Sequence, residues 1–249
     1  MHILIGIDDT DNKTSRGTGF HARQLAARLE SELGIAVHGI TRHQQLVHPD
    51  VPYTSQNSSA CLDVEANDIN ILKTFCRSHM IENQVPGSDI GLCIVEWAEI
   101  TKEIISFAWS VKKVVVTQQL ARNLASKNNI YLEGLCGTED GVIGALAATG
   151  LRRSGNDGRF IWLNGAVKEL RDLPEGICTL SELLKISGIQ QIETPQNTII
   201  ENKGRILLNN WIRPVLKNNK AVLIATKSIN NASYDWETAT KDIVKKLSD

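Results

Sequence analysis

The chain opens with His2-Ile3-Leu4-Ile5-Gly6-Ile7-Asp8-Asp9-Thr10-Asp11, an apolar and largely β-branched run that stops at three acidic residues. A short run of this kind, ended by turn residues, is typical of a strand that is buried on both faces. We therefore expect residues 2–7 to form a central strand whose carboxyl end carries the acidic cluster.

A helix is predicted directly after this strand. A polar, glycine-containing loop fills residues 12–19, and apolar residues then recur at helical spacing at Ala22, Leu25, Ala26, Leu29 and Leu33. Gly34 stands where a C-cap glycine belongs. The expected order is strand, acidic loop, helix.

Strand and helix patterns alternate through the rest of the chain. Further strands are predicted at 35–40, 59–64, 90–95, 159–163, 198–208 and 221–226, and further helices at 69–76, 100–108, 120–125, 142–148 and 180–186. Turn residues become more frequent after Asp157-Gly158. This pattern predicts an α/β (α+β) fold with two domains, 1–154 and a smaller, β-rich 155–249.

The charge of the chain is nearly balanced, with 27 Lys and Arg against 28 Asp and Glu over 249 residues. Basic residues form only short pairs, such as Lys112-Lys113 and Arg152-Arg153, so no basic stripe is available for a polyanion. We expect no tight binding of nucleic acid by this chain alone.

The five cysteines are scattered and form no C-x-x-C pair, which argues for free thiols in a reducing compartment and against a structural zinc site. The first residues lack the basic segment and cleavage site of a secretory signal. The chain is expected to be cytoplasmic, without a membrane segment.

The acidic cluster is the strongest chemical signal. Asp8, Asp9 and Asp11, with the hydroxyl of Thr10 on the same turn, place three carboxylates where they repel one another unless a cation is present. Carboxylates are natural ligands of Mg²⁺, which usually also binds substrate phosphates. The alternative is that one Asp caps the next helix and the others face water. An Asp-x-Asp-x-Thr phosphatase motif is not matched, because its final Thr is missing.

The loop that follows suits an anion. Thr14, Ser15, Arg16, Gly17 and Gly19 offer hydroxyls, a cation and backbone N–H groups just before a helix begins. The loop does not match the Walker pattern. We expect it to bind phosphate.

A second glycine-rich loop, Gly137-Thr138-Glu139-Asp140-Gly141, leads into the predicted helix at 142–148. Thr138 and Gly141 are candidate cofactor contacts, and Glu139 or Asp140 could complete a metal site if the two loops meet. The alternative is close helix packing at Gly144, with Thr138 as N-cap. The histidines His21, His43, His48 and His79 lack metal-ligand spacing and are expected to be packed or solvated.

Four segments together resemble a known family. Ile5 to Asp11, Pro52-Tyr53-Thr54, Ser88-Asp89-Ile90-Gly91 and Gly141 to Ala148 are similar in order and spacing to the kinase-like and ferredoxin-like core of the archaeal agmatinylcytidine synthetases. That family modifies a cytidine in the anticodon of an isoleucine tRNA. The resemblance implies a mixed-sheet kinase-like core in 1–154 and a ferredoxin-like or β-rich module in 155–249.

The same resemblance implies a chemistry. The family uses ATP and Mg²⁺ with an acidic motif that matches Asp8, Asp9 and Asp11, and Thr18 is the counterpart of its phosphorylated threonine. Asp8, Asp9 and Thr18 are therefore the expected catalytic residues. This chain shows neither the OB-fold nor the cysteine-bound zinc ribbon of the family, so it is expected to be a stand-alone core.

The leading hypothesis is an ATP- and Mg²⁺-dependent enzyme of phosphotransferase or ligase type. Its acceptor is either a small molecule or an RNA that a partner delivers, and homo-oligomers are compatible with the sequence. One alternative is a non-catalytic module that binds a nucleotide or metabolite. The other is an RNA-modifying enzyme that needs a partner to hold its RNA.

Overall fold

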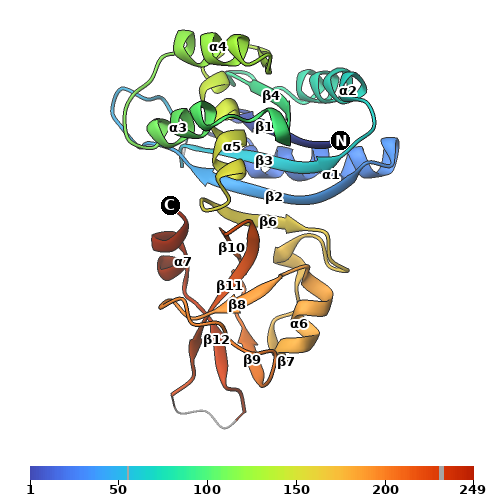
Figure 1. Cartoon of the computed structure of the whole chain (residues 1–249), viewed down its shortest axis with the longest axis vertical. Coiled ribbons are helices and arrows are strands. Elements are labelled where there is room, and N and C mark those ends of the chain that lie inside the picture. Colours follow the sequence, from blue (N-terminus) through green and yellow to red (C-terminus); the bar gives the residue numbers. More distant parts are fainter. Residues whose placement is uncertain (55, 230–232) are drawn as a thin grey trace. The chain divides into compact units, whose positions relative to one another are not determined.

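Figure 1 shows a computed structural model of the chain, which describes residues 1–54, 56–229 and 233–249. The chain divides into two compact units, Met1–Ser154 and Gly155–Asp249. Both units contain helices and strands, which confirms the α+β class. No helix in the described part of the chain is both long and apolar enough to cross a membrane.

The N-terminal unit is built on antiparallel strands. β1 (His2–Asp8) lies between β3 (Ser58–Glu65) and β4 (Gly91–Glu96). β2 (Ala36–Gln44) extends the sheet beside β3, and β5 (Tyr131–Gly134) extends it beside β4. The order β5-β4-β1-β3-β2 makes β1 the central strand that its sequence predicts.

Both faces of β1 are covered, since Ile3, Leu4, Ile5 and Ile7 are fully buried. Alternate side chains of a strand point to opposite faces, so helices must cover the sheet on both sides. At Gly6 a Cβ atom would lie 2.0 Å from the Ala145 carbonyl oxygen. Only glycine fits at this crossing of a helix over β1.

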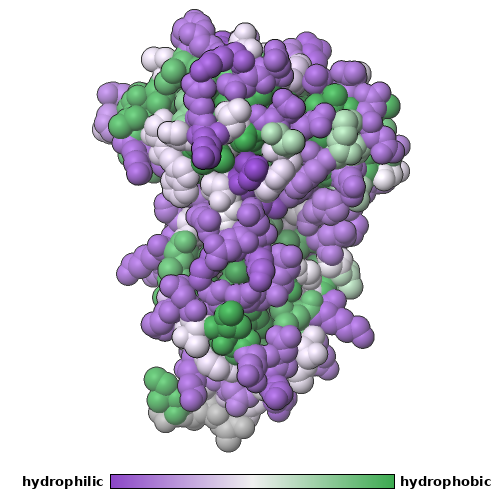
Figure 2. Space-filling view, in the orientation of Figure 1, coloured by the Kyte–Doolittle hydropathy of each residue, from purple (hydrophilic) through white to green (hydrophobic). Residues whose placement is uncertain are grey.

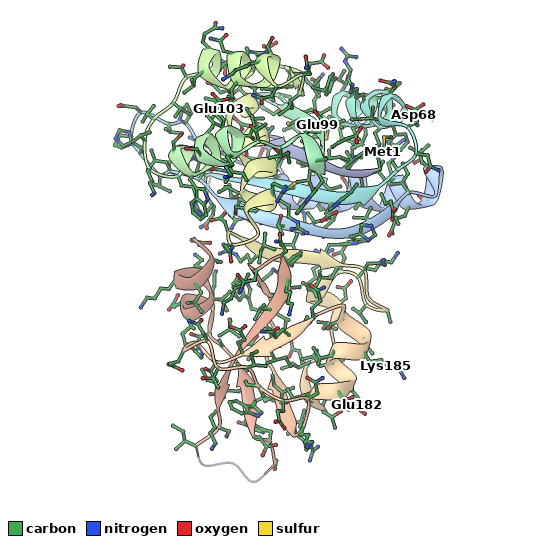
Figure 3. All side chains as sticks on the ribbon, viewed as in Figure 1. Met1, Asp68, Glu99, Glu103, Glu182 and Lys185 are labelled. Carbon is green, nitrogen blue, oxygen red and sulfur yellow. The ribbon has the colours of Figure 1, made fainter. Side chains whose placement is uncertain are left out.

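The helices of this unit begin and end at residues that suit these positions. They are α1 (Thr18–Leu33), α2 (Ile69–Glu82), α3 (Lys102–Val111), α4 (Gln118–Lys127) and α5 (Gly141–Ser154), with a short 3₁₀ turn, η1 (Trp97–Glu99), after β4. Gly34 ends α1 in the left-handed conformation, at a φ of 65°, as predicted. Asp68, labelled in Figure 3, caps α2 by accepting the N–H of Asn70.

One apolar core lies under α3, α4 and α5. It includes Leu4 of β1, Ile104 and Phe107 of α3, Leu124 of α4 and Leu146 of α5. Its burial anchors α5 on the sheet. As a result, the first turn of α5 is held beside the carboxyl end of β1.

The C-terminal unit contains α6 (Leu180–Ser187) and α7 (Lys241–Ser248), the 3₁₀ turn η2 (Leu170–Asp172), and the strands β6 (Arg159–Leu163), β7 (Gly176–Thr179), β8 (Gln191–Glu193), β9 (Arg205–Leu208), β10 (Val215–Lys217), β11 (Lys220–Lys227) and β12 (Trp236–Thr238). These strands pair in the order β6-β10-β11-β12-β9-β7, with β8 also beside β11. The pairs β8–β11 and β9–β12 are parallel. Thr179 and Glu182, of which Figure 3 labels Glu182, form a capping box that starts α6.

The predicted strand at 198–208 is wrong over most of its length. Only Arg205–Leu208 is a strand, and Ile199 forms an isolated bridge with Glu193. Asn197 and Gly204 have φ angles of 68° and 100°, which turn the backbone at both ends of the intervening segment. Apolar content alone did not show these turns.

A buried histidine on α2 makes the stability of the fold depend on pH. His79 is 2% exposed, and its Nδ1 lies 2.9 Å from Nη1 of Arg28. Burial, with the charge of Arg28, lowers the pKa of His79 from 6.5 to about 4. The neutral imidazole therefore contributes stability that is present above pH 6.5 and lost as the pH falls toward 4.

We predict that His79→Gln makes the protein less sensitive to acid. Urea unfolding at pH 7.5 and 4.5 should show that the loss of unfolding free energy on acidification shrinks by roughly 2 kcal/mol. His38→Gln is the control, because the His38 side chain is 44% exposed. An unchanged acid loss in His79→Gln would contradict this prediction.

Candidate functional site

The backbone turns sharply where β1 ends. Asp9 follows the strand with a φ of 51°, in the left-handed region that Asp tolerates better than most residues. Its carbonyl accepts the N–H of Asp89 at 3.1 Å, and Asp8 pairs with Gly91 across β1 and β4. Because the two strands are antiparallel, the end of β1 meets the start of β4, and Asp89 joins the acidic cluster.

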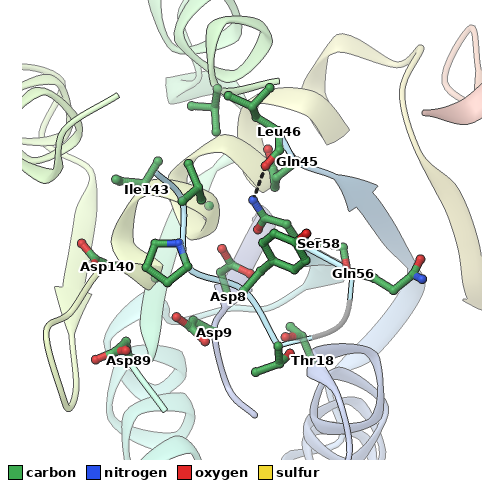
Figure 4. A pocket seen from close by; sticks show the side chains of 18 of the residues that line it. Asp8, Asp9, Thr18, Gln45, Leu46, Gln56, Ser58, Asp89, Asp140 and Ile143 are labelled. Atoms are coloured by element: carbon green, nitrogen blue, oxygen red, sulfur yellow. Dashed lines mark hydrogen bonds between the residues drawn. The ribbon is translucent and has the colours of Figure 1, made fainter. Parts of the chain in front are cut away.

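A pocket of about 260 Å³ opens at this edge of the sheet. Five carboxylates gather at the end of β1 in its lining, Asp8, Asp9, Asp11, Asp89 and Asp140, and the exposed Asp50 is a sixth lining carboxylate. Figure 4 shows four of the five on one side of the pocket, with Gln45, Gln56 and Ser58 on the other. The site therefore has an acidic half, and the rest of its lining consists mainly of amide, hydroxyl and apolar groups together with Arg42 and Asp50.

Burial and mutual repulsion disfavour the ionised forms of two carboxylates in the acidic half. Burial, and then the charge of Asp9, raises the pKa of Asp8 to about 8. Burial, with the charges of Asp89, Asp11 and Asp140, raises the pKa of Asp9 to about 6. Ionising both carboxylates near neutral pH is costly, and a bound cation would reverse that cost.

The five carboxylates differ in their hydrogen bonds. Asp11 accepts from Thr54 Oγ1 at 2.8 Å and from Thr18 Oγ1 at 3.4 Å. Asp140 accepts from Gln118 Nε2 at 2.7 Å and from a threonine hydroxyl. Asp89 accepts the backbone N–H of Thr138. No side chain in the described part of the chain donates to Asp8, Asp9 or Asp89, so these carboxylates are the ones most available to a ligand.

Two helices start at the pocket. Gly17, Thr18 and Gly19 at the start of α1, and Gly141 and Gly144 at the start of α5, line it. No side chain caps α1, so its first N–H groups are open to an acceptor. A helix N-terminus carries partial positive charge and favours an anion such as phosphate.

Close packing sets the position of Asp8. A Cβ atom on Gly144 would lie 1.8 Å from Oδ2 of Asp8, and one on Gly141 would lie 2.5 Å from the Asp89 carbonyl oxygen. The second glycine-rich loop therefore packs closely and also brings Asp140 to the acidic half. The close packing expected at Gly144 is present, and a role of this loop in binding a metal or cofactor stays a prediction.

Several predicted contacts lie away from the pocket lining. Thr10 is 1% exposed and points into the protein. Asn12 Oδ1 accepts the N–H groups of Thr14 and Ser15 at 2.9 Å, and Arg16 lies over the Phe20 ring, so this loop is organised by its own contacts. Thr138 donates to the Asp140 carboxylate instead of lining the pocket. The alternative in which one Asp of the cluster caps the next helix does not hold, since the N-cap of α1 is Gly17.

Other lining residues were not assigned a role from the sequence. They are Asp89, Arg42, Gln45, Leu46, Asp50, Val51, Gln56, Asn57, Ser58, the segment around Val111 to Val116, and Pro52, Tyr53 and Thr54. The segment carrying Asp89 did resemble the synthetase family, which was the one signal for it. Pro52, Tyr53 and Thr54 shared that resemblance. The remaining residues, which include Arg42 of β2 and Ser58 of β3, carry no chemical motif.

The carboxylates of the pocket suit one kind of metal site and not another. Within residues 1–54, 56–229 and 233–249, no three His, Cys, Asp or Glu side chains converge as a metal site made by protein alone. Mg²⁺ commonly takes only one or two carboxylates and completes its shell with phosphates and water. Asp8 and Asp9, both raised in pKa and both without side-chain donors, fit that second kind of site.

Part of this chain is similar to known proteins. No family model matches the chain. A curated relative, an uncharacterized protein of Methanocaldococcus jannaschii, is 29% identical over 157 residues, which cover 60% of this chain and 49% of the relative. Similar solved structures include those of a tRNA agmatidine synthetase.

Apo TiaS, the tRNA agmatidine synthetase, is 27% identical with a TM-score of 0.53, and its complex with an isoleucine tRNA and ATP is 28% identical with a TM-score of 0.54. Each match covers 60% of this chain. The chain spans about half of the curated relative and about 35% of the TiaS chain. The comparison supports the TiaS-like core that the sequence predicts.

Proposed function

We propose that the N-terminal unit binds ATP with Mg²⁺ in this pocket and acts as a phosphotransferase or ligase-like enzyme. One observation carries the proposal: Asp8, Asp9 and Asp89 converge with the open start of α1 in a single pocket. Carboxylates and a helix N-terminus attract opposite charges, and a metal-bound polyphosphate satisfies both. The TiaS complex with ATP supports the nucleotide.

Asp8 and Asp9 would hold the metal. Their carboxylates are adjacent, have raised pKa values and receive no side-chain hydrogen bond in the described chain. When bound, Mg²⁺ would neutralise charge on the phosphates. Asp11 has a different role in this proposal, because Thr18 and Thr54 occupy its oxygens and it orders the loops around the site.

The start of α1 would bind phosphate oxygens. Gly17 and Gly19 line the pocket without side chains that would keep a phosphate away from the backbone. Phosphoryl transfer depends mainly on positioning and charge stabilisation, which fixed N–H groups provide. The Thr18 hydroxyl also lies at the start of α1, where it donates a hydrogen bond to Asp11.

A thermal unfolding screen with and without Mg²⁺ tests the proposal. A ligand at one hundred times its dissociation constant adds about 2.7 kcal/mol of stability. We expect ATP with Mg²⁺ to raise the Tm, and ATP with EDTA to have little effect. A flat response to every nucleotide would exclude both the enzyme and the nucleotide-binding module.

Thr18→Ala is predicted to weaken binding of ATP with Mg²⁺ by about 3- to 10-fold, the value of one ordinary hydrogen bond. Thr18→Ser is the matched control and should bind as the parent does. We also expect no phosphate on Thr18 after incubation with ATP, because this residue is 6% exposed and its hydroxyl donates to Asp11. Mass spectrometry checks this point, and a phosphothreonine would contradict it.

RNA modification is the second candidate, and the TiaS complex with tRNA favours it. The net charge of -1 argues against a strong RNA grip by this chain alone. We predict a Kd for bulk tRNA weaker than about 10⁻⁶ M at moderate salt, in the range of non-specific binding. Sub-micromolar binding in a filter assay that weakens steeply with salt would instead favour RNA as the acceptor.

A further inference from the structure

Gln45 stands out on the side of the pocket opposite the acidic cluster (Figure 4). It follows the last residue of β2, and its backbone N–H donates to the Asn57 carbonyl at 2.8 Å. The residue lines the pocket, where Figure 4 labels it, and is only 5% exposed. Its side chain is thus a buried part of the wall.

The amide of Gln45 is only half satisfied. Nε2 donates to Ser59 Oγ at 2.6 Å, whereas Oε1 has no hydrogen-bond partner among the described residues. A buried acceptor without a partner costs about 1–3 kcal/mol, and such groups in folded proteins need a reason. A ligand that donates a hydrogen bond to Oε1 would supply this reason.

The apolar part of the surroundings favours a ligand with flat, apolar faces. Leu46, Val51, Pro52 and Tyr53 line the pocket beside Gln45, and Val114, Val115 and Val116 also contribute to the lining. Small-molecule sites commonly combine apolar walls with a few polar groups that fix orientation. The ring of a base with an exocyclic amino group would pack against these apolar walls, and its amino group would donate to Oε1 of Gln45.

The position of Gln45 agrees with such a ligand. Ile7 pairs with Ala60, so Ser59 lies beside the end of β1, where the acidic half begins. Ser59 in turn holds the Gln45 amide. From cross-strand spacing, the amide is on the order of 10 Å from the Asp8 carboxylate. A base can reach Gln45 while phosphate or a reacting group stays near the acidic half.

We infer that Gln45 is a specificity-determining residue of this site, whose Oε1 selects a nucleobase that carries an amino group. Oε1 is covered by protein atoms, and the soft terminal torsion of the side chain lets the amide turn toward a ligand. The inference rests on the proposed function. The base is either the adenine of ATP or the base of an acceptor nucleoside, and the experiment separates these two sources.

The first arm compares ATP with purine riboside triphosphate, in which hydrogen replaces the 6-amino group, each with Mg²⁺. The second arm uses cytidine and its 4-deamino analogue in the presence of ADP and Mg²⁺. In at least one arm the parent should bind the amino-bearing compound at least about tenfold more tightly, which is the loss expected when one buried hydrogen bond is removed.

Gln45→Met keeps the length of the side chain and removes the acceptor, so it should abolish the preference and leave affinity for the deamino compound unchanged. Gln45→Glu keeps an acceptor and should keep the preference. Gln56→Met is the matched control, because Gln56 lines the same pocket with an exposed side chain and should behave as the parent.

Three outcomes would overturn the inference. The first is equal binding of both compounds by the parent in both arms, and the second is a preference that Gln45→Met retains. The third is a preference for the 6-oxo or 4-oxo base, inosine or uridine, which would mean that Nε2 faces the ligand. If the parent binds none of these nucleotides, the proposed function fails as well, so the two failures are distinguishable.

Discussion

Asp9→Asn is expected to abolish Mg²⁺-dependent binding of ATP, with a rise in Kd of about 100-fold or more, equivalent to nearly 3 kcal/mol. The substitution removes a carboxylate of the acidic cluster to which no described side chain donates. It keeps the size of the side chain. Since the pKa of Asp9 is raised to about 6, the ionised group destabilises the metal-free protein at pH 8. The apo variant should therefore be as stable as the parent or more stable.

Isothermal titration with ATP and Mg²⁺, and unfolding without ligand at pH 8, measure the two effects. Asp50→Asn is the matched control, since Asp50 lines the same pocket but its side chain is 78% exposed. It should bind the nucleotide as the parent does. If Asp9→Asn binds normally, the acidic cluster is only a turn and the proposed metal position is wrong.

Asp63→Asn is expected to be the most destabilising of the substitutions considered, at about 3–5 kcal/mol. Asp63 of β3 is 3% exposed and pairs with Arg152 of α5, which is 8% exposed, and with His2 Nε2 at 2.7 Å. The substitution removes the negative charge of Asp63 from beside the buried Arg152 guanidinium. The amide of Asn can replace a hydrogen bond but not the charge.

Thermal and urea unfolding measure this loss, which corresponds to a fall in Tm of roughly 10 °C in a chain of this size. Glu103→Gln is the control. Glu103 pairs with Lys127 at 2.9 Å, but both side chains are at least half exposed, so the loss should stay below about 1 kcal/mol. A loss of similar size in both variants would mean that burial does not govern the Asp63 pair.

Local sequence determined the elements that carry the site. An apolar run stopped by acidic residues specified β1, and helical spacing ended by Gly34 specified α1. These signals are local, because burial on both faces and the left-handed cap depend on residues within one element. The α+β class followed from the order of such elements.

Local patterns were less informative in the C-terminal unit. The short strands β7, β8, β10 and β12 have only three or four residues each, too few to show a period. β7, β8 and β12 pair with strands distant in the sequence, whereas β10 pairs with the adjacent β11. The sequence predicted a β-rich character here and the longer strands β6 and β11, but not these short strands.

For the candidate site, the sequence by itself determined that Asp8, Asp9 and Asp11 leave a buried strand ahead of a helix. Only the tertiary structure decided which carboxylates meet. The antiparallel register of β1 and β4 brings Asp89 beside Asp9, and the close approach of α5 at Gly144 brings Asp140. Strand register and helix packing are set by contacts far apart in the chain, so no local pattern encodes them.

The division of roles within the site was likewise decided in three dimensions. Thr54 and Thr18 engage Asp11, while Asp8 and Asp9 receive no side-chain donor in the described chain. Gln45 reaches the pocket only because β2 lies beside β3 and Ser59 holds its amide. Residue type fixes what a side chain is able to bind. Whether it has a partner inside the protein depends on the fold, since burial removes water as the alternative partner.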